Sequence, residues 1–246
     1  MPADPLIILV IGAFAGGIIT GLAGFGSGPV VMGLWLLAIE PKIAAPLLML
    51  SALIYLPLSI RTVWQAIAWK RIAPFVVGSA IGVPFGIWQL KTLSPETIKL
   101  AIGVFLILYG ILRLAIRNPP AIRPNGPLPD AAVGILGGFV GGAAAIPGVI
   151  WSLWCGLRGW NKDEQRAIYQ PLNLIAVVFI LAGLAVSGLV TREVVGYASW
   201  CIPAALVGVA IGTALYRHVG EIGFQNIVLL LLSGSGLALI LNVMTR

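Results

Sequence analysis

The sequence predicts an all-α polytopic membrane protein built from two repeated halves. Of its 246 residues, 59% are hydrophobic and only 9% are charged, whereas a soluble domain carries about 25% charged residues. Charge-poor stretches follow one another along almost the whole chain, and short motifs of the first half recur in the second. We expect each half to contain a broken or re-entrant first segment plus three transmembrane helices, and the halves to form inverted repeats.

The charge-poor stretches are long enough for membrane helices. A helix needs ~20 apolar residues to cross the ~30 Å hydrocarbon core, whereas a β-barrel shows shorter segments of alternating polarity. In order, the stretches are 6–39, 44–60, 72–90, 94–116, 131–157, 167–190, 194–216 and 222–244. The linkers between them leave no room for a soluble domain.

The first stretch, residues 6–39, is too long for one crossing. As a single helix its 34 residues would measure about 51 Å at ~1.5 Å per residue. Its middle, Thr20–Pro29, is rich in glycine and ends in proline, so we expect the helix to break there. A broken backbone at membrane depth must be buried in protein or line a polar cavity, which makes this segment a candidate site.

The chain has an internal duplication. The matched motifs are Gly17–Gly21 with Gly138–Gly142, Pro46–Leu47 with Pro171–Leu172, Gly78–Gly82 with Gly208–Gly212, and Tyr109–Leu112 with Ser235–Ala238. A proline-rich linker, residues 117–129, separates a first repeat, 1–116, from a second, 130–246. Repeats of this size in a polytopic chain are a signature of secondary transporters.

The basic residues discriminate between two topologies. If all eight stretches cross the membrane, the 15 Lys and Arg residues divide eight to seven between the two sides. If the first stretch of each half is a re-entrant hairpin, they divide ten to five, as the positive-inside rule requires. We favour the hairpins, with both termini outside the cytoplasm, and single crossings remain the alternative. The net charge of +7 is then explained by orientation in the membrane, not by nucleic-acid binding.

The two predicted breaks are candidate binding elements. Gly26, Ser27 and Gly28 lie at the first break, and Pro147 with Gly148 lies at its counterpart in the second half. Two half-helix N-termini pointing to the bilayer midplane would present free N–H groups and partial positive charge to an anion. Alternatively, the glycines serve only close helix packing.

A polar run, residues 157–174, supplies the other candidates. Arg166, Gln170 and Asn173 are spaced i, i+4 and i+7, so they share one helical face. A guanidinium binds two oxygens at once, and with two amides it suits a small oxyanion such as a sulfonate.

A second interpretation makes the same run an interfacial loop. Asp163 and Glu164 would then pair with Lys162 and Arg166, and the amides would bind neighbouring helices. The first half has Ala45 and Leu48 at the positions of Gln170 and Asn173, so any pocket between the halves should be asymmetric.

These motifs resemble the TauE/SafE sulfite-exporter family across essentially the whole chain. The resemblance rests on Gly21–Gly28, Gly137, Ile146–Gly148, the run Arg158–Arg166, and Gln170–Asn173. It implies transport of sulfite or small organosulfur anions across the inner membrane of a bacterium.

We therefore expect a secondary transporter of a small sulfur-containing anion, with alternating access between the halves. Its expected partners are the anion and the lipid bilayer. We expect no nucleic acid, cofactor, metal or enzymatic activity, because the lone His218 lies in a predicted loop and acids near the site are scarce: Glu40, Asp163 and Glu164. A transporter of an unrelated solute or amino acid and a non-transporting scaffold are the alternatives. The particular sulfur compound, the direction, the coupling ion and the oligomeric state stay open.

Overall fold

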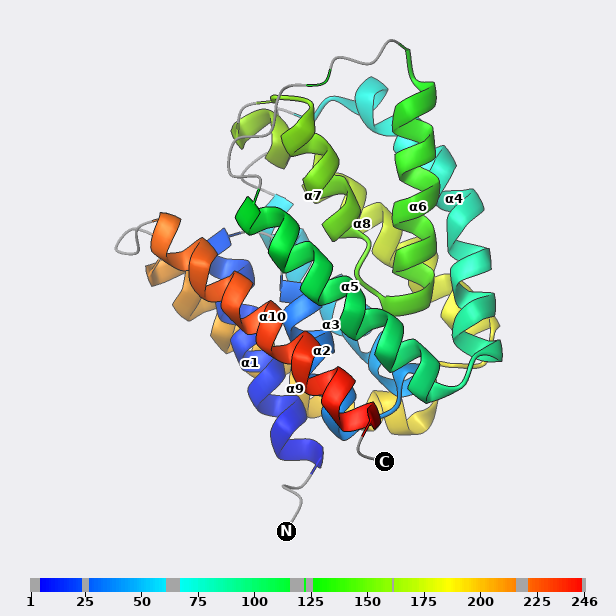
Figure 1. The fold of residues 1–246 in the computed structure, drawn as a ribbon, viewed down its shortest axis with the longest axis vertical. Coiled ribbons are helices and arrows are strands. Elements are labelled where there is room, and N and C mark those ends of the chain that lie inside the picture. Colours follow the sequence, from blue (N-terminus) through cyan, green and yellow to red (C-terminus); the bar gives the residue numbers. More distant parts are fainter. Residues whose placement is uncertain are drawn as a thin grey trace.

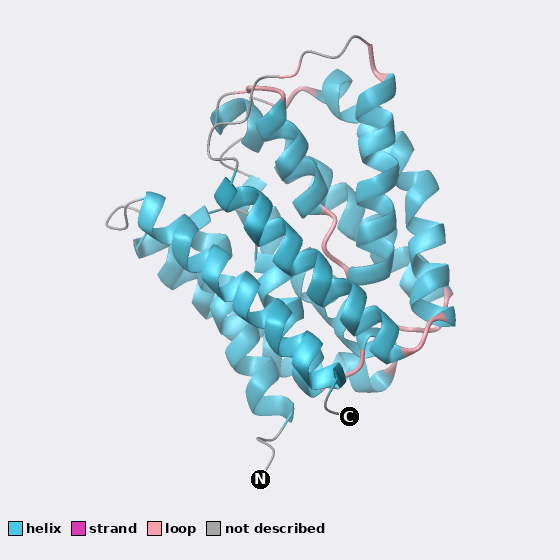
Figure 2. Cartoon of the chain, in the orientation of Figure 1, coloured by secondary structure: helices cyan, strands magenta, loops and turns pink. Residues whose placement is uncertain are grey.

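The structure is a computed structural model that describes residues 5–23, 27–60, 67–115, 122, 126–160, 162–215 and 221–244. Within these ranges it contains ten α-helices and no strand (Figure 2). In chain order (Figure 1), they are α1 (Pro5–Ala23), α2 (Ser27–Ala38), α3 (Pro41–Ile60), α4 (Trp69–Thr92), α5 (Pro95–Ala115), α6 (Leu128–Ala144), α7 (Gly148–Leu157), α8 (Lys162–Val186), α9 (Arg192–Leu215) and α10 (Glu221–Met244). The all-α fold is therefore confirmed.

Both over-long stretches contain two helices each. Residues 6–39 contain α1 and α2, and residues 131–157 contain α6 and α7. Pro29 lies in the first turn of α2, and Pro147 immediately precedes α7. Proline suits both positions because the first N–H groups of a helix have no partner inside it. Each of the other six charge-poor stretches contains one helix.

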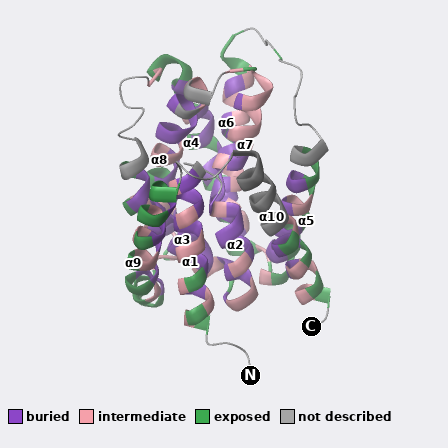
Figure 3. Cartoon of the chain, turned by 90° about the vertical axis from the view of Figure 1, so that its left-hand side faces the viewer, coloured by how far each residue is buried: buried purple, intermediate pink, exposed green. Residues whose placement is uncertain are grey.

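The surface of the helix bundle is apolar. Judged on the described residues, five helices are long and apolar enough to cross a bilayer: α1, α4, α5, α8 and α9. Large side chains such as Phe85, Leu108 and Val207 are more than half exposed. Figure 3 shows exposed residues along α9, with buried residues in the helices beside it. Lipid is a favourable solvent for such a surface and water is not, so the chain is a polytopic membrane protein.

Two pairs of helices, α1 with α9 and α4 with α6, run parallel and pack closely through glycine residues. Gly17 of α1 lies against Ala205 and Gly208 of α9, and Gly21 lies one turn further along, against Val209 and Gly212. A Cβ at either glycine would collide with backbone atoms of α9. The α4–α6 pair repeats this pattern through glycines at 78, 82 and 86 of α4 and 134, 138 and 142 of α6. Small residues allow this close backbone approach, which supplies much of the packing energy between helices in lipid.

The helices on either side of each break form antiparallel hairpins. Gly12 and Gly16 of α1 lie against Trp35 and Val31 of α2. Similarly, Gly137 and Gly141 of α6 lie against Trp151 and Pro147. In each hairpin, the glycine further along the first arm lies against a residue that comes earlier in the second arm. The two arms therefore run in opposite directions.

The remaining helices complete the bundle. Helices α5 and α10 cross at Gly103 and Gly236, and their directions are opposite (Figure 1). Helix α3 packs on α8 and α9, while α8 packs on α3 and α4. The most deeply buried large side chains include Trp35, Trp151 and Phe75, so both hairpins contribute to the core.

Candidate functional site

The first break carries a buried polar cluster. The Thr20 hydroxyl of α1 donates a hydrogen bond of 2.7 Å to the hydroxyl of Ser27, which is the first residue of α2. Both side chains are buried, and the Tyr55 hydroxyl of α3 lies within hydrogen-bonding range of both. Because buried hydroxyls are costly without partners, this cluster ties together the two arms of the hairpin and α3.

The second break is built differently. Helix α6 ends at Ala144, and the next residue, Ala145, has a left-handed φ of 58° and donates its N–H to the Gly141 carbonyl at 2.8 Å. A non-glycine residue in this conformation is strained by roughly 1–2 kcal/mol. Helix α7 then begins at Gly148 without a side-chain cap. In its first turn the Val149 N–H donates a long hydrogen bond of 3.5 Å to the Ile146 carbonyl, and no side chain caps the turn.

The two breaks meet inside the bundle. A Cβ added to Gly28 would lie 3.3 Å from the Ile146 side chain and 3.9 Å from the Ala145 carbonyl oxygen. The first turn of α2 thus lies against the turn that precedes α7. Two half-helix N-termini, from opposite halves of the sequence, are adjacent.

Helix α8 places its amides beside this junction. The Asn173 side chain covers Gly148, since a Cβ there would lie 2.7 Å from the Asn173 Oδ1. Gln170, one turn earlier on the same face, is only 3% exposed. Its Oε1 is buried without a hydrogen-bond partner. A buried polar atom left unpaired costs about 1–3 kcal/mol, so this oxygen is a candidate for contact with a hydrogen-bond donor of a ligand.

Two of the eight predicted site positions fall wholly or partly outside the described residues. Gly26 and the side chain of Arg166 lie outside the described residues; Arg166 is known only as a position in α8. The other six, Ser27, Gly28, Pro147, Gly148, Gln170 and Asn173, are described and gather around the junction of the two breaks. Their binding role stays a prediction.

A small cavity lies next to the first break. It has a volume of about 10 Å³ and is lined by residues of α1, α2, α3 and α9: Ala13, Gly16, Gly17, Val31, Trp35, Leu48, Ser51, Tyr55 and Ala205. This is about enough for one water molecule. A sulfonate would need the surrounding helices to move apart.

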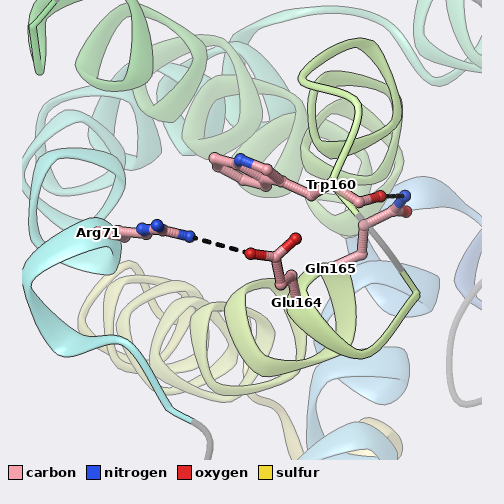
Figure 4. Close-up of polar contacts among 4 residues, drawn as sticks. All are labelled: Arg71, Trp160, Glu164 and Gln165. Carbon is pink, nitrogen blue, oxygen red and sulfur yellow. Dashed lines mark hydrogen bonds and ion pairs between the residues drawn. The ribbon is translucent and has the colours of Figure 1, made fainter. Parts of the chain in front are cut away.

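Charged and aromatic side chains gather where α4 and α8 begin and α7 ends. Arg71 of α4 lies 3.6 Å from the Glu164 carboxylate of α8 (Figure 4). Its guanidinium also lies 5.8 Å from the centre of the Trp160 ring, and the Trp160 carbonyl accepts a hydrogen bond from Gln165. The predicted pairing of Asp163 and Glu164 with Lys162 and Arg166 stays untested, because three of those side chains lie outside the described residues.

Asp130, near the start of α6, completes this cluster. It is 7% exposed, accepts a hydrogen bond of 2.7 Å from the Trp154 indole, and lies 3.8 Å from the Arg158 guanidinium. The sequence interpretation did not include Asp130 among the acids near the site. Its signal was available: it is the lone acid at the start of the stretch 131–157. In the described part of the chain, no group of three His, Cys, Asp or Glu side chains is arranged to hold a metal.

Comparison with known proteins agrees with the architecture. Residues 8–239 match the sequence family described as "Sulfite exporter TauE/SafE". A protein of Comamonas testosteroni, the "Probable inner membrane transporter protein TsaS", is 27% identical over 179 residues, which cover 72% of this chain and 74% of that protein. No solved structure matches.

The family match spans nearly all of the helices described above, including both breaks and both hairpins. The similar protein is a probable inner-membrane transporter, and the apolar helices fit the same location. The chain is therefore a multi-pass transporter of the bacterial inner membrane and belongs to the TauE/SafE sulfite exporter family.

Proposed function

We propose that this protein is a secondary transporter that exports a small sulfur-containing anion, sulfite or an organosulfonate. The observation that carries the proposal is the junction of the α2 and α7 N-termini beside the buried amide side chain of Gln170. Helix N-termini bind anions through free N–H groups and the helix dipole. The family name supports sulfite or a related anion as the substrate.

The packing of the two halves supports inverted repeats. Helix α1 packs on α9, and α6 packs on α4. If α1 to α5 correspond to α6 to α10, these two contacts are equivalent, as are the contacts α3–α9 and α8–α4. The corresponding helices α5 and α10 run in opposite directions (Figure 1), as an inverted repeat requires.

Helix lengths and the charged cluster support the re-entrant hairpins. The return arms α2 and α7 have 12 and 10 residues, or about 18 and 15 Å, which is too short to cross the bilayer. The contact between Asp130 and Arg158 brings the two ends of the α6–α7 hairpin to the same end of the molecule. Arg71 lies at that end too, which agrees with the ten-to-five distribution of basic residues.

Each predicted site residue then has a role. The backbone N–H groups that follow the breaks at Gly28 and Gly148 would face the anion, with Gly26 and Pro147 shaping the two turns. Ser27 would add a hydroxyl, Gln170 and Asn173 would donate through their amides, and Arg166 would supply a fixed positive charge.

The burial of the junction favours alternating access. Ser27 and Gln170 are only 6% and 3% exposed, so the anion would reach the junction only after one half moves against the other. The membrane potential favours the exit of an anion by ~2.3 kcal/mol per charge per 100 mV. Export therefore does not require a coupling ion.

Thermal unfolding of the purified protein tests this function. Sulfite, thiosulfate, sulfoacetate and taurine would be compared with a sulfur-free carboxylate. At ~100 times its Kd, a ligand stabilises the folded state by ~2.7 kcal/mol, and we expect this for one or two sulfur anions. Arg166→Ala should abolish the shift, whereas Arg192→Ala at the exposed start of α9 should keep it. Stabilisation by the carboxylate alone, or by no anion, would contradict the proposal.

A further inference from the structure

We infer that Asp130 is a positioning residue for the binding site: it fixes α7, and thereby directs the α7 N-terminus toward Asn173 and Gln170. This inference rests on the proposed function. Asp130 is in contact with the C-terminal end of α7, through Trp154 and Arg158. The opposite end of that helix, Gly148, contacts Asn173.

Asp130, Trp154 and Arg158 form a closed set of three contacts. The carboxylate accepts the hydrogen bond from the Trp154 indole at 2.7 Å and lies 3.8 Å from the guanidinium. That guanidinium also lies 5.9 Å from the centre of the Trp154 ring. Asp130 and Arg158 side chains are only 10% and 18% exposed. Hydrogen bonds and ion pairs in such partly buried places are stronger than at an open surface.

The geometry of α7 transmits this fixation to the site. The helix has 10 residues and is therefore about 15 Å long, with an intact hydrogen-bonded backbone. A short helix held at its C-terminal end cannot tilt without moving its N-terminus. Because Gly148 lies directly under Asn173, a tilt would displace the first turn of α7 from the amides.

The repeat provides an independent argument. The match of Gly17 with Gly138 places Leu9 at the position of Asp130. In the first hairpin, the Trp35 indole donates a hydrogen bond of 3.0 Å to the Leu9 carbonyl. Both hairpins are thus closed by a tryptophan of the return arm on the same position of the first arm. Within the described residues, only the second hairpin uses a charged side chain, Asp130, as the acceptor. A carboxylate that served only to interact with the helix dipole of α6 would not need these contacts with α7.

The test combines anion binding with hydrogen exchange of the full-length protein. Asp130→Leu removes both contacts, while Asp130→Asn keeps an acceptor for Trp154 and removes the charge opposite Arg158. Ser152→Ala is the control, because Ser152 of α7 hydrogen-bonds only to the Val149 carbonyl of its own helix. The probe is the sulfur anion that most strongly stabilises the wild-type protein.

We expect Asp130→Leu to raise the Kd by roughly tenfold to a hundredfold and to accelerate amide exchange in residues 148–157. Asp130→Asn should show smaller changes in both, and Ser152→Ala should show neither. A lower unfolding temperature with unchanged Kd and exchange would overturn the inference and leave Asp130 a purely structural residue. If no anion binds the wild type, the proposed function fails, and exchange in 148–157 still decides whether Asp130 positions α7.

Discussion

The first hairpin, α1–α2, is closed by the Trp35 indole on a backbone carbonyl, whereas the second, α6–α7, is closed by Trp154 and Arg158 on the Asp130 carboxylate. The two hairpins have the same antiparallel arrangement, and in both the second arm packs against glycine residues of the first. A carbonyl acceptor depends on the backbone alone. A carboxylate acceptor can be changed by a single substitution, so the second hairpin is the more specialised one.

The breaks differ in the same sense. Thr20, Ser27 and Tyr55 form a polar cluster at the first break. The second has the left-handed Ala145, an apolar Ile146 and no side-chain cap on α7. Hydrogen bonds therefore hold the first break, and backbone geometry forms the second. The comparison teaches that the α1–α9 and α4–α6 interfaces are built alike, whereas the two breaks between them are not.

The largest expected effect tests whether the α4–α6 and α1–α9 interfaces are equivalent. Gly78 of α4 and Gly208 of α9 are matched positions in the predicted repeat, and a Cβ at either would collide with the backbone of the neighbouring helix. Replacing either by valine should cost more than about 3 kcal/mol, because backbone cannot move aside as a side chain can. The yield of monodisperse protein in size-exclusion chromatography measures the loss.

Gly196→Val provides the control for these two variants. Gly196 lies on the same helix as Gly208, but no atom lies within 4 Å of an added Cβ. Its yield should remain that of the wild type. A severe loss for Gly208→Val together with a normal yield for Gly78→Val would mean that the two interfaces are not equivalent.

A smaller effect distinguishes the two buried tryptophans. Trp35 and Trp151 are both fully buried, and each lies over a glycine of the opposite arm. The Trp35 indole N–H is hydrogen-bonded, whereas that of Trp151 has no partner. Trp35→Phe should cost about 2–3 kcal/mol, and Trp151→Phe should cost roughly 1 kcal/mol less, because it also removes an unpaired donor.

Thermal unfolding of the two variants in one detergent measures this difference. Both variants replace an indole ring by a phenyl ring, so the effect of the lost side-chain volume largely cancels in the comparison. Equal unfolding temperatures would show that the Trp35 hydrogen bond contributes nothing to the first hairpin. A lower temperature for Trp151→Phe would indicate that its N–H has a partner in the membrane.

The sequence predicts the breaks because they depend on local properties. Stretch length, glycine content and the placement of Pro29 and Pro147 are all readable along one segment. The division of residues 6–39 and 131–157 into two helices each agrees with this. The grouping of Ser27, Gly28 and Gly148 agrees with the predicted duplication, since equivalent elements of two interlocked repeats would meet at a common centre.

Contacts between distant helices could not be predicted in this way. Arg71 pairs with Glu164, and Asp130 with Trp154, but nothing in their spacing shows that α4 lies beside α8 or that α7 folds back on α6. The same holds for Tyr55, whose hydroxyl reaches the first break from α3. Sequence periodicity predicts which face of a helix is buried but not which helix packs against that face. The sequence therefore offers Glu164 only partners that are close in the chain, Lys162 and Arg166.

The smallest expected effect concerns the polar connection across the first break. Thr20→Val keeps the shape of the side chain and removes the donor to Ser27. It should cost about 0.5–1.5 kcal/mol, the usual net value of one hydrogen bond, because the Tyr55 hydroxyl remains within reach of Ser27. Thermal unfolding measures the loss. The second half has Gly141 at the equivalent position, so no matched change exists there.

Thr213→Val is the control for Thr20→Val. Thr213 is exposed on α9, and its hydroxyl bonds only to the Val209 carbonyl of its own helix, so its loss should cost less than about 0.5 kcal/mol. If the Thr20 and Thr213 variants are equally stable, the polar cluster does not hold the first break. The conformation of α2 would then depend on packing alone, and the difference between the two hairpins would reduce to the contacts of Asp130 with Trp154 and Arg158.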